Sequence, residues 1–170
     1  MPEESQLTNN SSLSIRATGP TRGGQHLTIS DRTIEKLRFL LLKAGLPTGT
    51  ITFTIRKYSD KSVVATKAWG DAGDLTTSAV WREVTFDTPV YVNEESLILM
   101  EFSGGDASNK VNIRAQNSDV KGGENYIQYE GSWGDIGSYD TAYVYTYAEP
   151  PVVAGGGGMD AAVAVADGQI

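Results

Sequence analysis

The chain has 170 residues and a formal net charge of −7, with 39% hydrophobic and 21% charged residues. This length and composition indicate one globular domain with a hydrophobic core of its own. The acidic charge and the lack of any Lys/Arg cluster argue against binding to nucleic acid or to anionic membranes. The chain has no cysteine, which excludes disulfides, thiol catalysis and cysteine-ligated zinc.

The N-terminal segment, residues 1–12, is polar and rich in Asn and Ser, and we expect it to form an arm. The stretch "MPEESQLTNNSSLSIR" has neither a basic n-region nor an apolar h-region, so no signal peptide is expected. No run approaches the ~18 apolar residues that are needed to span a bilayer. These features are typical of a protein made in a cytoplasm that stays there, or leaves by another route such as inside a virus particle.

Residues 13–148 have the pattern of a β-domain. "TITFTIRKY" alternates strictly, with Ile51, Phe53 and Ile55 on one face and polar residues on the other. Similar short runs follow, separated by clusters rich in Gly, Asp, Asn and Ser that favour turns. The pattern predicts an antiparallel β-sandwich or jelly roll. The expected core residues are Ile51, Phe53, Ile55, Trp81, Val84, Phe86, Leu97, Leu99 and Phe102.

One segment, "SDRTIEKLRFLLLKAG", is compatible with two structures. Ile34, Leu37 and Leu41 have helical spacing, and Gly45 is a typical helix terminator. With a period of two, Leu37, Phe39 and Leu41 instead share one face of a strand. The resemblance described next favours a strand over residues 34–42.

Four stretches carry a resemblance to a known group of proteins: "IEKLRFLLLKAGLPTGTITFTIRKY", "VVATKAW", "VWREVTFDTPVYVNEESLILMEFSGG" and "ENYIQYEGSWGDIGSYDTAYVYTY". Together, over residues 25–147, they resemble a jelly-roll module of bacterial surface and tailed-phage structural proteins, similar in shape to carbohydrate-binding modules. At residues 93–96 the chain has Asn-Glu-Glu-Ser where that family often has Gly-Thr-x-Tyr. The resemblance implies an all-β jelly-roll-like sandwich, and its motifs are structural rather than functional.

No motif points to catalysis, and we expect the protein not to be an enzyme. The chain has one histidine, His26, and no signature places a nucleophile or a carboxylate beside it. Two carboxylates can hydrolyse glycosidic bonds, but most of the acidic residues lie in turn clusters, where solvated carboxylates are the usual finding. The acids considered are Glu101, Asp119, Glu124, Glu130, Asp135 and Asp140.

Three aspartates in Gly-rich turns are weak candidates for calcium ligands: Asp71, Asp74 and Asp106. The spacing in "GDAGDL" is not that of a known calcium loop, and turn-forming Asx side chains explain these residues equally well. No other cofactor is expected.

Aromatic residues are the candidates for a ligand-binding surface, because flat rings stack on sugar rings. Trp133 lies in the Gly-flanked loop "EGSWGDIGSYD", with Tyr129 and Tyr139 close in sequence. Trp133 either packs beneath the last strand, as in the family that the chain resembles, or binds a ligand.

The C-terminal segment, residues 149–170, is rich in Gly, Ala and Val, and we expect an arm that binds a partner. Residues 155–158 are four glycines, which form a flexible hinge. Met159, Val163, Val165 and Ile170 then offer apolar anchors. The "AVAVA" run has the alternation of a strand that adds to the sheet edge of another chain, and a short helix is the alternative.

The expected function is therefore that of a non-catalytic virion structural protein. It would be a capsid decoration, cement or fibre protein on the surface of a tailed phage. Its expected partners are other virion proteins, either the major capsid protein or copies of itself. The alternative is a carbohydrate-binding module, with a surface glycan as its ligand. A small glycan hydrolase is the third hypothesis.

Overall fold

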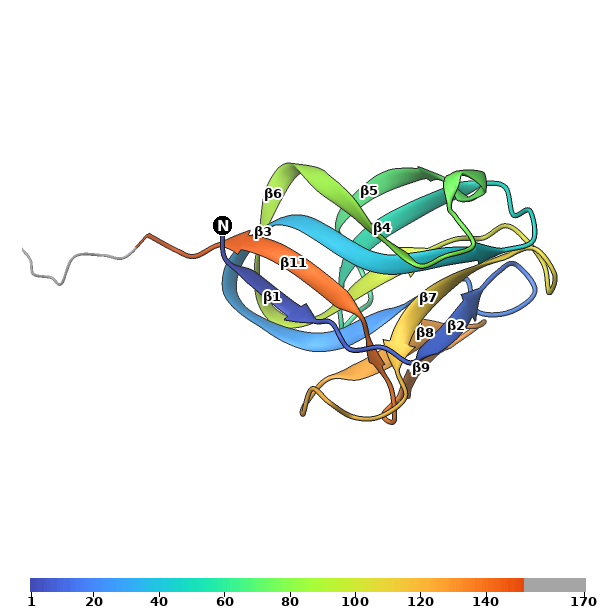
Figure 1. Cartoon of the computed structure of the whole chain (residues 1–170). Helices are drawn as coiled ribbons and strands as arrows, with labels where there is room; N and C mark the ends of the chain where they lie inside the picture. Colours follow the sequence, from blue (N-terminus) through green and yellow to red (C-terminus); the bar gives the residue numbers. More distant parts are fainter. Residues whose placement is uncertain (152–170) are drawn as a thin grey trace, which may run out of the picture.

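The computed structural model describes residues 1–151, which form an all-β fold in which every strand pair is antiparallel (Figure 1). The predicted fold class is confirmed at this level. One turn of 3₁₀ helix, η1 (Ala72–Asp74), interrupts the strands. The strands are β1 (Glu3–Gln6), β2 (Ser11–Ile15), β3 (Arg22–Ala44), β4 (Thr50–Lys57), β5 (Val63–Asp71), β6 (Val80–Glu101), β7 (Lys110–Gln116), β8 (Asn125–Tyr129), β9 (Trp133–Ile136), β10 (Asp140–Thr141) and β11 (Tyr143–Ala148).

Two long strands, β3 and β6, form the centre of the fold and pair along almost their whole length. The register shifts between Ile29 and Arg32 and again between Ile34 and Lys36. Asp31, within the first of these irregularities, has a positive φ of 58°. Bulges of this kind bend a strand and increase its twist. The pair is thereby divided into two halves that belong to different parts of the sheet.

The first half contains residues 22–29 of β3 and residues 94–101 of β6, with β4 and β5 on one side and β8 and β9 on the other. We call this part the first layer. The second half is flanked by β11 and β1, and by β7 with β2 and β10. Side chains of the two halves meet in the interior, where the rings of Phe39 and Phe53 pack edge to face with centroids 5.1 Å apart.

Strand alternation places the core residues as the sequence predicts, with one exception. Eight of the nine expected core residues are buried, and Trp81 is half-buried instead. Val84 and Phe86 share the inward face of β6, so Trp81 has the opposite parity and points outward. Leu97 and Leu99 are buried in a separate small cluster with Ile127, on the outer side of the first layer.

The ambiguous segment is a strand, as predicted for residues 34–42, and it lies in the C-terminal half of β3. Leu37 is fully buried, with Val84 of β6 opposite it on one side and Tyr145 of β11 on the other. The segment therefore has hydrogen-bonding partners on both edges. Gly45 ends it with a φ of 71°, in a turn where a Cβ would lie 2.2 Å from the carbonyl oxygen of Ser108.

The N-terminal segment is part of the sheet in this structure, where the sequence predicted an arm. β1 pairs with β11, and β2 pairs with β7. The buried side chain of Gln6 donates to the carbonyl oxygens of Asp140 and Thr141, at 3.2 and 3.1 Å. A polar segment can form an edge strand because backbone hydrogen bonds need no apolar side chains.

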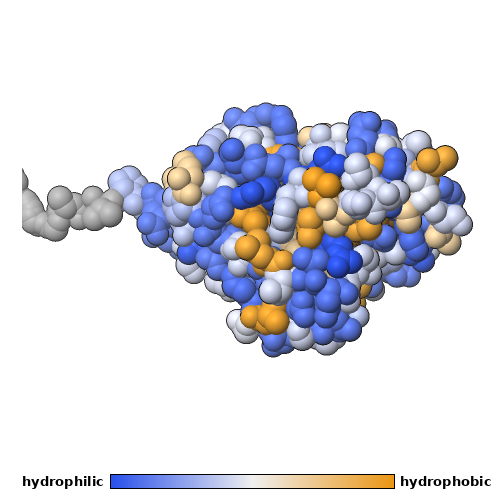
Figure 2. Space-filling view, viewed as in Figure 1, coloured by the Kyte–Doolittle hydropathy of each residue, from blue (hydrophilic) through white to orange (hydrophobic). Residues whose placement is uncertain are grey.

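The surface seen in Figure 2 is largely hydrophilic, with small apolar patches between polar residues. Among the residues described, no helix has the length and hydrophobicity that crossing a bilayer requires. The predicted C-terminal arm lies outside the described residues from position 152 onward.

Candidate functional site

The outer side of the first layer carries a group of aromatic and charged side chains that strand pairing brings together. Five neighbouring strands contribute one residue each to a continuous row. Tyr129 lies opposite both Trp133 and Arg22, and Glu101 lies opposite both Arg22 and Thr52. We call this set the outer row: Trp133, Tyr129, Arg22, Glu101 and Thr52. Side chains at paired positions point to the same face, so all five are neighbours there.

The aromatic end of the outer row is arranged around an arginine. The rings of Tyr129 and Trp133 have centroids 5.1 Å apart and are tilted by 58°. The guanidinium carbon of Arg22 lies 4.5 Å from the centroid of Tyr129 and 5.6 Å from that of Trp133. These are cation–π distances. Both rings are half-buried, so each keeps part of its surface open to solvent.

The other end of the outer row is an ion-pair network on Glu101. Arg56 of β4 donates from Nε to Oε2 of this carboxylate at 3.0 Å, and from Nη2 to Oε1 at 3.4 Å. Nε of Arg22 lies 3.5 Å from Oε1. Two guanidinium groups therefore share one carboxylate, which leaves a local excess of one positive charge.

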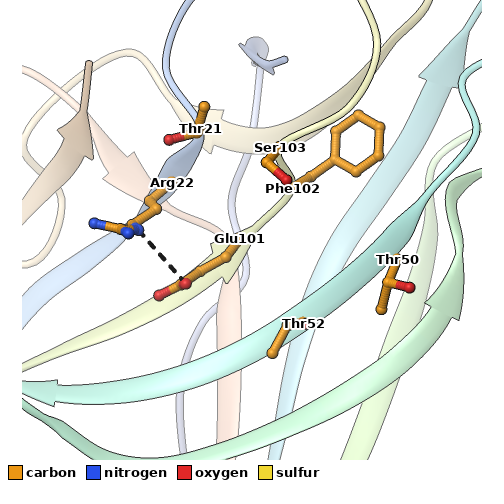
Figure 3. A pocket seen from close by; sticks show the side chains of 7 residues that line it. All are labelled: Thr21, Arg22, Thr50, Thr52, Glu101, Phe102 and Ser103. Atoms are coloured by element: carbon orange, nitrogen blue, oxygen red, sulfur yellow. Dashed lines mark ion pairs between the residues drawn. The ribbon is translucent and has the colours of Figure 1, made fainter. Parts of the chain in front are cut away.

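A pocket of about 250 Å³ opens beside this network (Figure 3). Four hydroxyl side chains line it together with the Arg22–Glu101 ion pair and the ring of Phe102. The full lining is Thr21, Arg22, Thr50, Thr52, Glu101, Phe102 and Ser103. Three of these residues also belong to the outer row, so the pocket and the aromatic pair form one continuous surface.

Trp133 also packs against protein. The apolar cluster of Leu97, Leu99 and Ile127 lies beneath it, and Tyr58 covers the same cluster. Trp133 packs on this outer cluster and not beneath β11, where the packing interpretation from sequence placed it, and ligand binding stays a prediction. One part of the ring is fixed by the cluster, and the rest lies beside Tyr129 and Arg22.

His26 is the centre of a second group on this face, which the sequence did not indicate. Its Nε2 lies 2.9 Å from Oε2 of Glu95, and its Nδ1 lies 3.1 Å from Oδ1 of Asp135. The ring stacks on Tyr58 with centroids 3.8 Å apart. Among the described residues, no serine or threonine hydroxyl is hydrogen-bonded to His26. The contacts of His26 link β3 to Glu95 of β6 and to Asp135 of β9.

Tyr139 is not brought to the outer row. It is partly buried and packs against the main core, and its carbonyl oxygen accepts a hydrogen bond from the backbone N–H of Tyr126 at 2.8 Å. Of the three aromatic residues expected to bind a ligand, the structure therefore groups Tyr129 with Trp133. The contribution of Arg22 and Glu101 was missed because these residues are distant in sequence from the Trp133 loop.

The three candidate calcium ligands do not form one cluster. Asp71 accepts from the backbone N–H groups of Gly73 and Gly49, at 2.7 and 3.1 Å. Asp106 accepts from Ser108 and Asn109 in a different turn, and these hydrogen bonds lower the pKa of Asp106. In the part of the chain that the structure describes, no group of three His, Cys, Asp or Glu side chains is arranged to hold a metal ion.

Two other acids from the sequence survey belong to a buried polar network away from the pocket. Asp140 is fully buried and accepts from Nε2 of Gln25 at 2.6 Å and from the backbone N–H of Lys121 at 2.8 Å. Glu124 accepts from the hydroxyl of Tyr143 at 2.7 Å. Burial raises the pKa values of both Glu124 and Tyr143. These contacts attach the 117–124 loop to the sheet.

The proposed partner-binding residues Met159, Val163, Val165 and Ile170 lie outside the described residues. The comparisons with known proteins bear on none of the sites: the chain matches no family model, and no curated protein is significantly similar to it.

Proposed function

We propose that this protein is a non-catalytic binding domain that binds carbohydrate on the outer side of its first layer. The observation that carries the proposal is the continuity of the outer row with the pocket. Tyr129 and Trp133 lie at one end of that surface, and the hydroxyl-lined pocket lies at the other.

The chemistry of a sugar fits both ends. The C–H faces of a pyranose ring pack on aromatic rings, and its hydroxyls need donors and acceptors within hydrogen-bonding distance. Thr and Ser hydroxyls can do both, while Arg22 donates and Glu101 accepts. Both charged groups already contact protein partners, which reduces the ordering that binding of a ligand would require.

The finer fold assignment belongs to the same proposal. We propose that the two halves of the sheet correspond to the two layers of a jelly-roll-like module. The long bent strands β3 and β6, which pass from one half to the other, support this assignment.

The role expected first, that of a virion decoration, cement or fibre protein, stays a prediction. Its argument rests on residues 152–170, which lie outside the described residues. The two roles are compatible, since a protein on a particle surface can also bind a glycan.

The proposal is tested by titrating the protein against a panel of purified oligosaccharides with calorimetry. We expect binding by the wild type and a loss of about tenfold or more in affinity for Trp133→Ala. Trp69→Ala is the matched control, because Trp69 is also half-buried beside an arginine, 5.3 Å from Arg82, but lies on β5 and packs against the main core. Absence of binding to every oligosaccharide, or equal affinities for the two variants, would contradict the proposal.

A further inference from the structure

We propose that Arg22 recognises a carboxylate, so that the ligand of this surface is an acidic glycan that contains uronic acid. The inference rests on the proposed carbohydrate binding and names the class of sugar. It is drawn from the hydrogen bonding, the orientation and the charge of one guanidinium group.

The terminal nitrogens of Arg22 have no partner in the part of the chain that is described. Its only polar contact there is the ion pair of Nε with Glu101, at 3.5 Å. Arg56, on the same carboxylate, is different: its Nη2 reaches Glu101, and its Nη1 donates to the carbonyl oxygen of Lys61 at 2.9 Å. Arg56 is therefore a structural arginine, whereas Arg22 has both Nη groups available for a ligand.

The orientation of Arg22 is fixed although its end has no partner. The guanidinium lies over the ring of Tyr129, and Glu101 holds it from the side of the pocket. The side chain of Arg22 is 30% exposed, so its terminal Nη groups reach solvent. A planar guanidinium that is held in place matches the two oxygens of a carboxylate with two parallel hydrogen bonds.

The local charge supports the same class of ligand. Arg22 and Arg56 together exceed Glu101 by one positive charge. The other carboxylates close to this face, Glu95 and Asp135, are directed to His26. A carboxylate on the sugar would pair with the Nη groups of Arg22, which have no carboxylate partner among the described residues, while a neutral sugar would not. Because the whole chain carries −7, binding of an acidic glycan should depend on this site and weaken with salt.

The test compares two ligands that differ only at the carboxyl group. One is a uronic acid oligosaccharide, and the other is the same oligosaccharide with its carboxyls reduced to primary alcohols. By calorimetry, we expect the wild type to bind the acid about tenfold or more tightly than the reduced form. Equal affinity for both, or preference for the reduced form, would overturn the inference and leave carbohydrate binding intact. Binding of neither would overturn both.

Variants assign the preference to Arg22. In Arg22→Gln the preference for the acid should fall to within about twofold. Arg22→Lys keeps the charge but loses the planar pair of N–H donors, so its preference should be intermediate. Arg82→Gln is the matched control, because Arg82 also lies over a tryptophan ring but belongs to the second half of the β3–β6 pair, and it should keep the full preference. A full preference in Arg22→Gln would overturn the inference. If that variant does not fold, Arg22→Lys and the ligand pair decide the question.

Discussion

The rings of Tyr58 and His26 lie flat against each other, with centroids 3.8 Å apart and planes 10° from parallel. Tyr58 follows β4, and His26 is on β3. The imidazole also reaches Glu95 of β6 and Asp135 of β9. One side chain thus connects three strands of the first layer, β3, β6 and β9, with the residue that follows β4. β9 has four residues and, among the described residues, pairs only with β8, so the contact with His26 helps to hold the strand that carries Trp133.

Replacing His26 with Ala should therefore loosen the β8–β9 hairpin. Hydrogen bonds between a histidine and partly exposed carboxylates contribute about 1 kcal/mol, which corresponds to about fivefold faster exchange by local opening. The measurement is amide hydrogen exchange of residues 125–136 by mass spectrometry. Thr28→Ala is the control, because Thr28 points to the same side of β3 but is exposed. Unchanged protection of residues 125–136 in His26→Ala would show that the contacts of His26 do not stabilise the hairpin.

The strands are the part of this structure that sequence alone predicts well. Ile51, Phe53 and Ile55 alternate strictly, and all three are fully buried. Trp81 was expected in the core as the start of the run that leads to Phe86, yet Val84 and Phe86 set the inward parity of β6 and Trp81 has the opposite one. Residue type gives the tendency to be buried, and register decides which face a residue takes.

The candidate site is much harder to predict from the sequence than the strands are, because its residues meet only through strand pairing. His26 and Asp135 are 109 positions apart, and Arg56 and Glu101 are 45 apart. Trp133 and Tyr129 were singled out because they are aromatic and close in sequence. No local pattern indicates that Arg22 lies over Tyr129, since that contact follows from the pairing of β3 with β8.

The ion pair between Glu4 and Lys121 should make stability depend on pH. Their atoms Oε2 and Nζ are 2.6 Å apart, and this hydrogen bond is the largest of the effects that lower the pKa of Glu4. A carboxyl whose pKa is lower in the folded state stabilises the fold above its unfolded value of about 4.3. The stabilisation is lost as the pH falls through the folded pKa.

Glu4→Gln should accordingly lower the free energy of unfolding by roughly 0.5 kcal/mol at pH 7, since Glu4 is about one-third exposed. The difference from wild type should vanish near pH 2. Urea unfolding at both pH values measures it. Glu130→Gln, at an exposed residue without an ion pair among the described residues, should match the wild type throughout. A deficit of Glu4→Gln that persists at low pH would exclude this electrostatic origin.

The hydroxyl of Tyr126 is buried and has no hydrogen-bond partner among the described residues. Burial of a polar group without a partner is unfavourable. Tyr126→Phe should therefore raise the free energy of unfolding by about 1 kcal/mol, measured by urea denaturation. Tyr143→Phe is the contrasting variant, because it removes the hydrogen bond to Glu124, and it should be destabilising. A destabilised Tyr126→Phe would mean that the hydroxyl is satisfied in solution.

Gly24 allows the central strands of the first layer to approach each other. A Cβ at this position would lie 1.9 Å from the carbonyl oxygen of Ile98 and 2.9 Å from the Cα of Leu99. Both are backbone atoms of the partner strand β6, which cannot move aside without breaking the pairing on either edge. Gly24→Ala should therefore lower the free energy of unfolding by about 3 kcal/mol or more, and should reduce the yield of folded protein.

The control is Gly134→Ala on β9, where a Cβ would meet no atom within 4 Å and where the effect should be close to zero. Urea denaturation of both variants measures the difference, and equal midpoints would mean that the space between β3 and β6 admits a Cβ at residue 24.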